Sequence, residues 1–223
     1  MAAPKAPEAH SSPRRIGSPE AKNRIVLLDA AEGLMLADGY AAVTSRKVAE
    51  AAGLKPQLVH YYFRTMDELF AAVFRRRAEE GLLAQQLALA SEQPLWNLWR
   101  FGTDPAGTRL TMEIMGLANH RKALRSEIAE YAERFREQET QAFAAGLARY
   151  GVTEDEVPPV VWAVFTTSIA RVLVMEQELG MSCGHAETLA FVDTWLRRLE
   201  GDPLPMPDFA AMMAAMAEGE APN

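Results

Sequence analysis

The sequence predicts an all-α protein in which a small N-terminal unit of three helices precedes a larger helical body. Apolar residues recur with a 3.6-residue period in almost every long segment of the 223-residue chain, a spacing that places them on one face of a helix. No convincing run alternates apolar and polar residues in the way that a half-buried strand requires. Helix start and stop signals then divide the periodic segments into separate helices.

Capping residues, proline and glycine mark the ends of the first three helices. Ser18 is an N-cap residue, and Pro19 after it suits the first helical position. Gly39 interrupts the apolar period, Thr44 is the next N-cap, and Gly53 is a stop signal. Helices are therefore predicted at residues 19–38, 44–52 and 55–62.

A long fourth helix is predicted to connect these three helices to the rest of the chain. Thr65 and Glu68 have the Thr-x-x-Glu spacing of a capping box, in which a hydroxyl and a carboxylate each satisfy a free backbone N–H group. The apolar face of this helix continues from Leu69 towards Leu89. Further helices are predicted at 95–101, 105–118, 121–150, 157–179 and 185–199, with a weaker pattern at 208–217.

Composition divides the chain into parts and indicates a cytoplasmic protein. The N-terminal residues lack the continuous apolar core of a secretory signal, and Arg171 interrupts the most apolar stretch, 157–175, so a membrane span is not expected. The single cysteine, Cys183, excludes an internal disulfide and fits a reducing cytosol. The predicted parts are a flexible arm at 1–18, the three-helix unit at 19–65, the helical body at 66–200 and a tail at 201–223.

Charge is distributed unevenly along the chain, whose net charge is −7. Residues 1–80 contain 12 Lys and Arg against 10 Asp and Glu, a net charge of +2, whereas residues 81–223 contain 11 against 20, a net charge of −9. A positive front and a negative body suit a protein that meets DNA with its N-terminal end. The arm, with Arg14 and Arg15, either reaches a minor groove or is simply disordered.

Residues 44–63 have the pattern of a helix-turn-helix. Ala49 is small enough for two helices to approach closely, and Gly53 allows a tight turn between them. Leu54 and Val59 are placed to bury against Val48 and the helix at 19–38. In a helix-turn-helix the second helix lies in the major groove of DNA, whereas the alternative interpretation of the same spacing is an ordinary helical hairpin.

The order of several short motifs resembles the TetR family of regulators over residues 20–69. The landmarks are Ala30-Ala31, Gly39-Tyr40, Val43-Thr44, the run from Val48 to Gly53, Tyr62-Phe63 and Glu68-Leu69. The resemblance implies an Ω-shaped homodimer, a three-helix DNA-binding head, a connecting fourth helix, and a divergent ligand-binding and dimerisation body. It also implies a repressor that leaves a palindromic operator when a small, largely apolar effector binds.

Some positions depart from the family pattern. Lys55, Pro56, Gln57 and Leu58 stand where many relatives have other residues, so the base-reading surface is its own. Met66 replaces a lysine that usually contacts phosphate, a contact for which Arg64 or the Arg46-Lys47 pair is a substitute.

The candidate DNA-binding residues combine capping, basic and aromatic side chains. Thr44 can cap its helix and contact phosphate, Gln57 suits an adenine edge, and Lys55 suits a guanine edge. Tyr61 and Tyr62 offer hydroxyl groups to phosphates, although one of them can instead belong to the core, and His60 is either a contact or an inward residue. The full set is Thr44, Arg46, Lys55, Pro56, Gln57, His60, Tyr61, Tyr62 and Arg64.

The body contains soft apolar residues suited to an adaptable cavity, although the same residues can form ordinary core. Arg171 stands out because it lies in an otherwise uncharged segment, and a buried guanidinium requires a partner. That partner is an anionic ligand, Glu176 or Glu178, or a carboxylate across a twofold interface. The candidate ligand-binding residues are Trp96, Trp99, Met112, Met115, His120, Phe165 and Arg171.

Other classes of function lack sequence support. No glycine-rich phosphate loop, metal-ligand pair or nucleophile elbow occurs, so no catalytic residue, metal or cofactor is expected. The remaining alternative is a helical ligand-binding or protein-interaction module without specific DNA binding. The pattern leaves open whether the effector releases DNA or promotes its binding.

Overall fold

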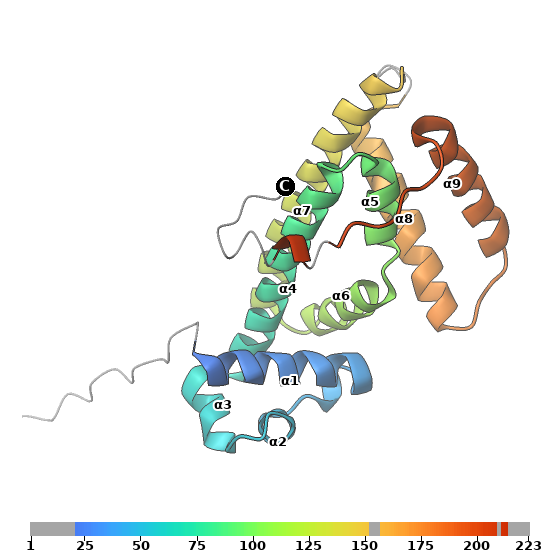
Figure 1. Cartoon of the computed structure of the whole chain (residues 1–223). Coiled ribbons are helices and arrows are strands. Elements are labelled where there is room, and N and C mark those ends of the chain that lie inside the picture. Colours follow the sequence, from blue (N-terminus) through green and yellow to red (C-terminus); the bar gives the residue numbers. More distant parts are fainter. Residues whose placement is uncertain (1–20, 152–156, 209–210, 214–223) are drawn as a thin grey trace, which may run out of the picture.

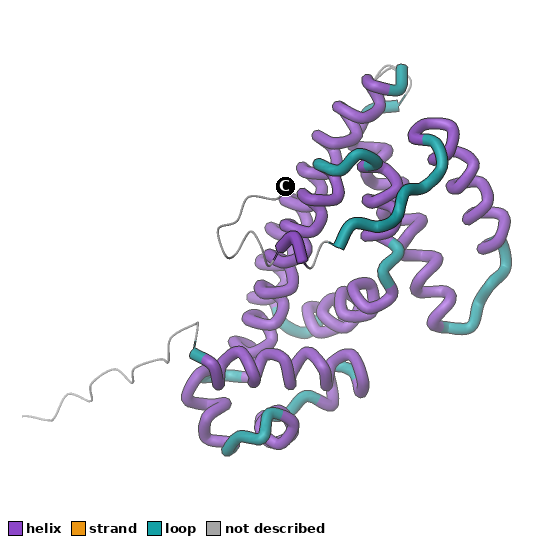
Figure 2. Tube along the Cα trace, viewed as in Figure 1, coloured by secondary structure: helices purple, strands orange, loops and turns teal. Residues whose placement is uncertain are grey.

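Helices make up nearly all the regular structure of the protein. The computed structural model describes residues 21–151, 157–208 and 211–213, and within these ranges it contains no strand (Figure 1, Figure 2). The all-α fold class is therefore confirmed. The elements are α1 (Lys22–Asp38), the 3-10 turn η1 (Tyr40–Ala42), α2 (Ser45–Ala51), α3 (Pro56–Tyr62), α4 (Met66–Leu89), α5 (Pro94–Gly102), α6 (Pro105–Ala118), α7 (Lys122–Arg149), α8 (Pro159–Glu178) and α9 (His185–Glu200).

The helix ends agree closely with the local signals in the sequence, with two differences. Helix α1 begins at Lys22, after Ala21, so the predicted start at Ser18 and Pro19 lies outside the described residues. Of the weak pattern at 208–217, the structure describes a helical turn at residues 211–213, and most of the remainder also lies outside the described part of the chain.

The first three helices pack around a small apolar core. Val48 and Ala49 of α2 and Val59 of α3 are almost completely buried against Leu27 and Leu28 of α1. The absence of a large side chain at Ala49 lets α2 and α3 approach each other, as the motif predicts. This arrangement leaves the opposite faces of α2 and α3 exposed to solvent.

Helix α4 starts with a variant of the predicted capping box. The Thr65 hydroxyl accepts a hydrogen bond from the N–H of Glu68 at 3.1 Å. The Glu68 carboxylate in turn accepts from the N–H of Arg64 at 2.7 Å, one residue before the usual donor. Further along α4, Arg76 donates to Asp29 at 2.5 Å and to Glu32 at 2.8 Å, which fixes α4 against α1.

The apolar core continues from the three-helix head into the body. Leu110, Ile114 and Leu117 of α6 belong to the same buried cluster as the core residues of α1 to α3. Because α6 packs directly on α1, the head is in contact with the body through α6 as well as through α4 (Figure 1).

In the body, α7 packs against both α4 and α8, and α9 packs against α5 on the far side of the molecule (Figure 1). The end of α9 is bound to the start of α5, since the Glu200 carboxylate accepts hydrogen bonds from the N–H groups of Leu95 and Trp96, each at 3.0 Å. Glu200 thereby caps a helix that has no side-chain cap of its own.

Helix α8 is long and apolar enough to cross a membrane by length and composition alone, with a mean hydropathy of 1.4. In this fold it instead packs on α5, α6 and α7. Its outward face nevertheless exposes a row of large apolar side chains: Val160, Val164, Phe165, Ile169, Val172 and Leu179.

Candidate functional site

The candidate DNA-binding residues gather on the exposed side of α2, α3 and the loop that follows. Eight of the nine are exposed, whereas Tyr62 is half-buried against the core of the head. Burial thus distinguishes the tyrosine that is open to solvent from the one that belongs to the core. Tyr61 is 49% exposed. Its ring meets that of Tyr62 edge to face, with the ring centroids 5.0 Å apart. His60 points to solvent rather than inward.

Local geometry explains how these side chains are presented. The Thr44 hydroxyl accepts a hydrogen bond from the N–H of Lys47 at 3.3 Å and is exposed at the start of α2. Pro56 occupies the first turn of α3, where its missing N–H costs nothing. Consequently α3 starts immediately after Lys55, and Gln57 lies in its first, solvent-facing turn.

The basic residues of this surface are available to phosphates. Among the described residues, Arg46, Lys55 and Arg64 make no ion pair with a carboxylate, whereas Lys47 lies 4.0 Å from Asp38. Unpaired cations on an exposed face attract the DNA backbone through long-range electrostatics.

A cavity of about 280 Å³ lies in the body between α4, α5, α6, α7 and α8. Aromatic rings form much of its wall: Phe74 meets Tyr131 edge to face at 5.4 Å, and Phe101 stacks on Phe135 at 6.5 Å. At Gly81 an added Cβ would lie 3.1 Å from the Phe135 ring, so glycine permits this close approach.

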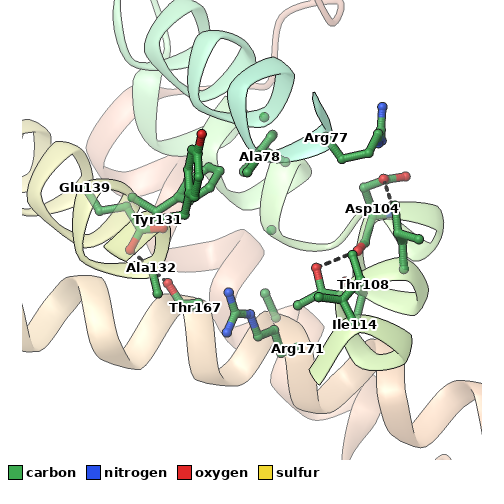
Figure 3. A pocket seen from close by; sticks show the side chains of 18 of the residues that line it. Arg77, Ala78, Asp104, Thr108, Ile114, Tyr131, Ala132, Glu139, Thr167 and Arg171 are labelled. Carbon is green, nitrogen blue, oxygen red and sulfur yellow. Dashed lines mark hydrogen bonds between the residues drawn. The ribbon is translucent and has the colours of Figure 1, made fainter. Parts of the chain in front are cut away.

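A buried carboxylate, Glu139 of α7, forms part of the cavity wall (Figure 3). It accepts hydrogen bonds from Thr167 at 3.0 Å, from Gln85 at 3.0 Å and from Arg136 at 3.2 Å. Burial raises the pKa of Glu139 above its ordinary value, and the hydrogen bond from Thr167 and the charges of Arg136 and Arg171 oppose this effect. The charge of Glu139 is therefore compensated from within the protein.

Arg171 of α8 extends its guanidinium into the space beneath Tyr131 and Ala78 (Figure 3). Although the residue as a whole is exposed at the cavity mouth, desolvation of its head group lowers the pKa of Arg171, and the charge of Glu139 opposes that shift. Glu176 and Glu178, the partners for Arg171 that the sequence suggested within the chain, pair with other residues. Glu176 lies 2.8 Å from His185, and Glu178 lies 3.8 Å from Arg109.

Sequence reasoning located some of the cavity wall and missed much of it. Trp99, Met115 and Arg171 line the cavity, whereas Met112 and His120 are exposed away from it. Trp96 is instead buried beneath the C-terminal segment, where its indole donates to the carbonyl of Gly201. The lining residues that sequence reasoning did not name include Phe74, Phe101, Tyr131, Phe135, Glu139 and Thr167.

One of the missed residues carries a recognisable signal. Tyr131, Phe135 and Glu139 are spaced four residues apart on α7, so they share one helix face. Because apolar residues continue this face at Phe143, a carboxylate within the stripe indicates a buried polar site.

A second, more apolar cavity of about 270 Å³ lies between α5, α7, α8 and α9. Phe165 lines this cavity, as does Trp99, which also lines the first one. Trp162 stacks on Trp195 at 4.8 Å across the same region. Its indole Nε1 atom is buried without a hydrogen-bond partner in the described structure.

Comparisons with known proteins agree with the helix-turn-helix geometry. Residues 27–73 match the family described as bacterial regulatory proteins, tetR family, a segment that runs from α1 into α4. No curated protein is similar to this chain at a significant level.

Solved structures share the fold along nearly their whole length. The reduced form of Escherichia coli NemR is 16% identical with a TM-score of 0.67, and the match covers 82% of this chain and 100% of NemR. A transcriptional regulator from Rhodococcus sp. RHA1 is 22% identical with a TM-score of 0.64, covering 81% and 100%. A TetR transcription regulator from Haloarcula marismortui is 18% identical with a TM-score of 0.64, covering 79% and 96%.

A helix-turn-helix head in contact with a helical body is the arrangement of a DNA-binding transcription regulator. Over residues 27–73 this chain matches the TetR family of transcriptional regulators, and solved regulators of that kind share its fold.

Proposed function

We propose that the protein is a cytoplasmic homodimeric repressor that binds a palindromic operator and releases it when a small molecule occupies the cavity between α4 and α8. In this proposal residues 19–65 are the DNA-binding domain and residues 66–200 the effector-binding and dimerisation domain. The observation that carries the proposal is the position of α6, which contacts the cavity on one side and the DNA-binding head on the other.

The exposed side of α2 and α3 supports operator binding. Its unpaired basic residues suit the phosphate backbone, and Gln57 in the first turn of α3 suits the N6 and N7 atoms of an adenine. Tyr61 and Thr44 offer exposed hydroxyl groups for further phosphate contacts. Loss of one good base contact costs about 1 to 3 kcal/mol of discrimination.

The outward face of α8 supports a dimer. Phe165 is 54% exposed, and Phe191 of α9, which lines the same second cavity, is 71% exposed. Large neighbouring apolar side chains on a monomer surface mark an interaction site. A twofold contact here would remove them from water and hold two recognition helices about 34 Å apart, one turn of DNA.

The contacts of α6 support release by an effector. Ile114 and Met115 line the cavity, while Glu113, between Leu110 and Leu117 on the same helix, reaches the turn before α2 and accepts a hydrogen bond from Tyr40. An effector that displaces α6 would therefore alter the position of α2 relative to α1. Such a ligand acts only if it binds the released conformation more tightly than the DNA-bound one.

The experiment is selection of genomic fragments by the purified protein at two salt concentrations. We expect enrichment of a palindromic site whose binding weakens as salt increases, because phosphate contacts release counterions. Gln57→Ala and Tyr61→Phe should both weaken binding to that site. The matched control is Gln177→Ala, which changes an exposed glutamine on α8.

Failure of a folded dimer to enrich any site at low salt would refute operator binding and favour a helical ligand-binding or interaction module. Enrichment of a site that lacks twofold symmetry would instead contradict the dimer. Release is tested separately, by adding candidate effectors to the protein–operator complex and measuring fluorescence anisotropy of the labelled DNA.

A further inference from the structure

The charged residues that line the first cavity differ in whether another group of the protein forms an ion pair or a hydrogen bond with them. Arg77 pairs with Glu80 at 2.9 Å and with Glu32 at 3.5 Å. Asp104 accepts a hydrogen bond from the N–H of Gly107 at 2.7 Å and so acts as a helix cap. Glu139 pairs with Arg136 and accepts hydrogen bonds from two neutral donors, Thr167 and Gln85.

Arg171 is the exception. Within the part of the chain that the structure describes, its guanidinium makes no ion pair of 4.0 Å or less. The negative charge that acts on Arg171 is that of Glu139. The oxygens of Glu139 already accept hydrogen bonds from Thr167, Gln85 and Arg136. An exposed guanidinium that lines a cavity and makes no ion pair can receive an anion from outside the chain.

The direction of the side chain favours the cavity over the exposed face of α8. Thr167, one helical turn before Arg171, bonds to Glu139 of α7, so this side of α8 faces α7. Val172 belongs to the exposed apolar row, and so does Val164, two helical turns before Arg171, so Arg171 lies at the border between that row and the side that faces α7. Figure 3 shows the Arg171 guanidinium on the side of Thr167, in the space beneath Tyr131 and Ala78 and turned from Thr108 and Ile114 of α6.

The remaining wall defines the other end of the ligand. Phe74, Phe101 and Phe135 line the same cavity as Arg171, and Met115 adds a flexible apolar side chain. A volume of about 280 Å³ accommodates a small organic molecule. The cavity thus combines ring-lined apolar walls with a cation that makes no ion pair within the described structure.

Resting on the proposed effector function of this cavity, we propose that the effector is an organic carboxylate, with its apolar body among the phenylalanine rings and its carboxylate on Arg171. Guanidinium and carboxylate match in two parallel hydrogen bonds, which gives orientation as well as affinity. This replaces the largely apolar effector expected from the sequence with an amphipathic anion.

The test compares acids with neutral molecules of the same shape. Calorimetry measures binding of phenylbutanoate and phenylbutanamide, and of octanoate and octanamide, to the full-length protein. We expect each acid to bind about tenfold more tightly than its amide, the effect of one charge-assisted hydrogen-bonding group. In Arg171→Gln this preference should fall to about threefold or less.

A matched variant controls for general loss of positive charge. Arg149 is exposed at the end of α7 and does not line the cavity, so Arg149→Gln should keep the acid preference. Thermal unfolding by circular dichroism establishes that both variants are folded. Sedimentation shows whether Arg171→Gln also changes the oligomeric state.

Equal binding of acids and amides, an unchanged preference in Arg171→Gln, or binding of neither acid at its solubility limit would each overturn the inference. Dissociation of the dimer by Arg171→Gln with the acid preference intact would assign the guanidinium to the subunit interface. Acids that bind through Arg171 but leave the operator bound would contradict the proposed release, not the carboxylate. Release by an amide alone would support release and overturn the carboxylate.

Discussion

The carboxylate of Glu113 accepts a 2.6 Å hydrogen bond from the backbone N–H of Tyr40, and so joins α6 to the turn between α1 and α2. Two glycines allow the approach. An added Cβ at Gly39 would lie 3.3 Å from the Glu113 carboxylate, and one at Gly116 would lie 3.3 Å from the Tyr40 ring. This contact is a direct polar connection between the cavity-lining helix and the DNA-binding head.

Replacement of Glu113 by alanine should uncouple the two regions. We expect Glu113→Ala to bind the effector alone and the operator alone with affinities close to those of the wild type. The reason is that Glu113 belongs neither to the cavity lining nor to the candidate DNA-binding residues. The ratio of operator affinities without and with effector should fall towards one. Anisotropy titrations at several effector concentrations measure this ratio, and Glu113→Gln, which keeps an acceptor, should retain most of it. An unchanged ratio in Glu113→Ala would place the coupling elsewhere, for example in α4.

Gly39 should be less tolerant of substitution than Gly53. The backbone of Gly39, with φ 79° and ψ 162°, lies in a region that only glycine adopts readily, and a side chain there would also press on Glu113. Gly53 has φ 64°, but a Cβ added there would meet open space. Urea unfolding should show a loss of about 2 to 3 kcal/mol for Gly39→Ala and about 1 kcal/mol for Gly53→Ala. Equal losses would mean that neither the backbone region of Gly39 nor its contact with Glu113 adds a cost.

A charge on the exposed face of α8 should break the dimer. Phe165→Glu places a carboxylate among apolar side chains that a partner would cover, and an unpaired buried charge is strongly unfavourable. Sedimentation velocity should show a monomer, with weakened operator binding. Ile25 is 45% exposed on α1, outside this face, so Ile25→Glu should remain a dimer. A dimeric Phe165→Glu would direct attention to another surface.

Alkaline pH should weaken the fold through Tyr150. Burial, together with the hydrogen bond to Glu200 at 2.9 Å, raises the pKa of Tyr150 to about 12 from an ordinary value of 10.0. Because the raised pKa belongs to the folded state, the stabilisation is complete below pH 10 and is lost as the pH rises from 10 to about 12. The stability difference between wild type and Tyr150→Phe should therefore shrink over this range. Tyr61→Phe, on the exposed surface, should give no such pH-dependent difference.

Much of the fold follows from the sequence because its signals are local. The hydroxyl groups of Thr44 and Thr65 each bond within their own first helical turn, so the starts of α2 and α4 were predictable from a few neighbouring residues. The position of α5 was predictable from Pro94 and the apolar period. Its cap was not, because Glu200 arrives from more than a hundred residues further along the chain.

The candidate DNA-binding surface was also predictable only as far as local signals reach. The exposed faces of α2 and α3 follow from helical period and from the burial of Val48 and Val59, so the exposed residues of this surface were largely accessible to sequence reasoning. Among them, burial in three dimensions separated Tyr61 from Tyr62. Here tertiary packing decided which of two adjacent, chemically identical side chains remained free.

By itself the sequence determined that this protein is helical, where its helices begin and end, and that its head is a helix-turn-helix, because periodicity and capping act over one or two turns. Only the tertiary structure decided what faces the cavity. Trp96 and Trp99 are neighbours on one short helix, yet the Trp96 indole donates to the carbonyl of Gly201 at 3.2 Å while Trp99 lines the cavity. The rotation of each helix against distant partners fixes such differences, and it also left Arg171 without a carboxylate of its own.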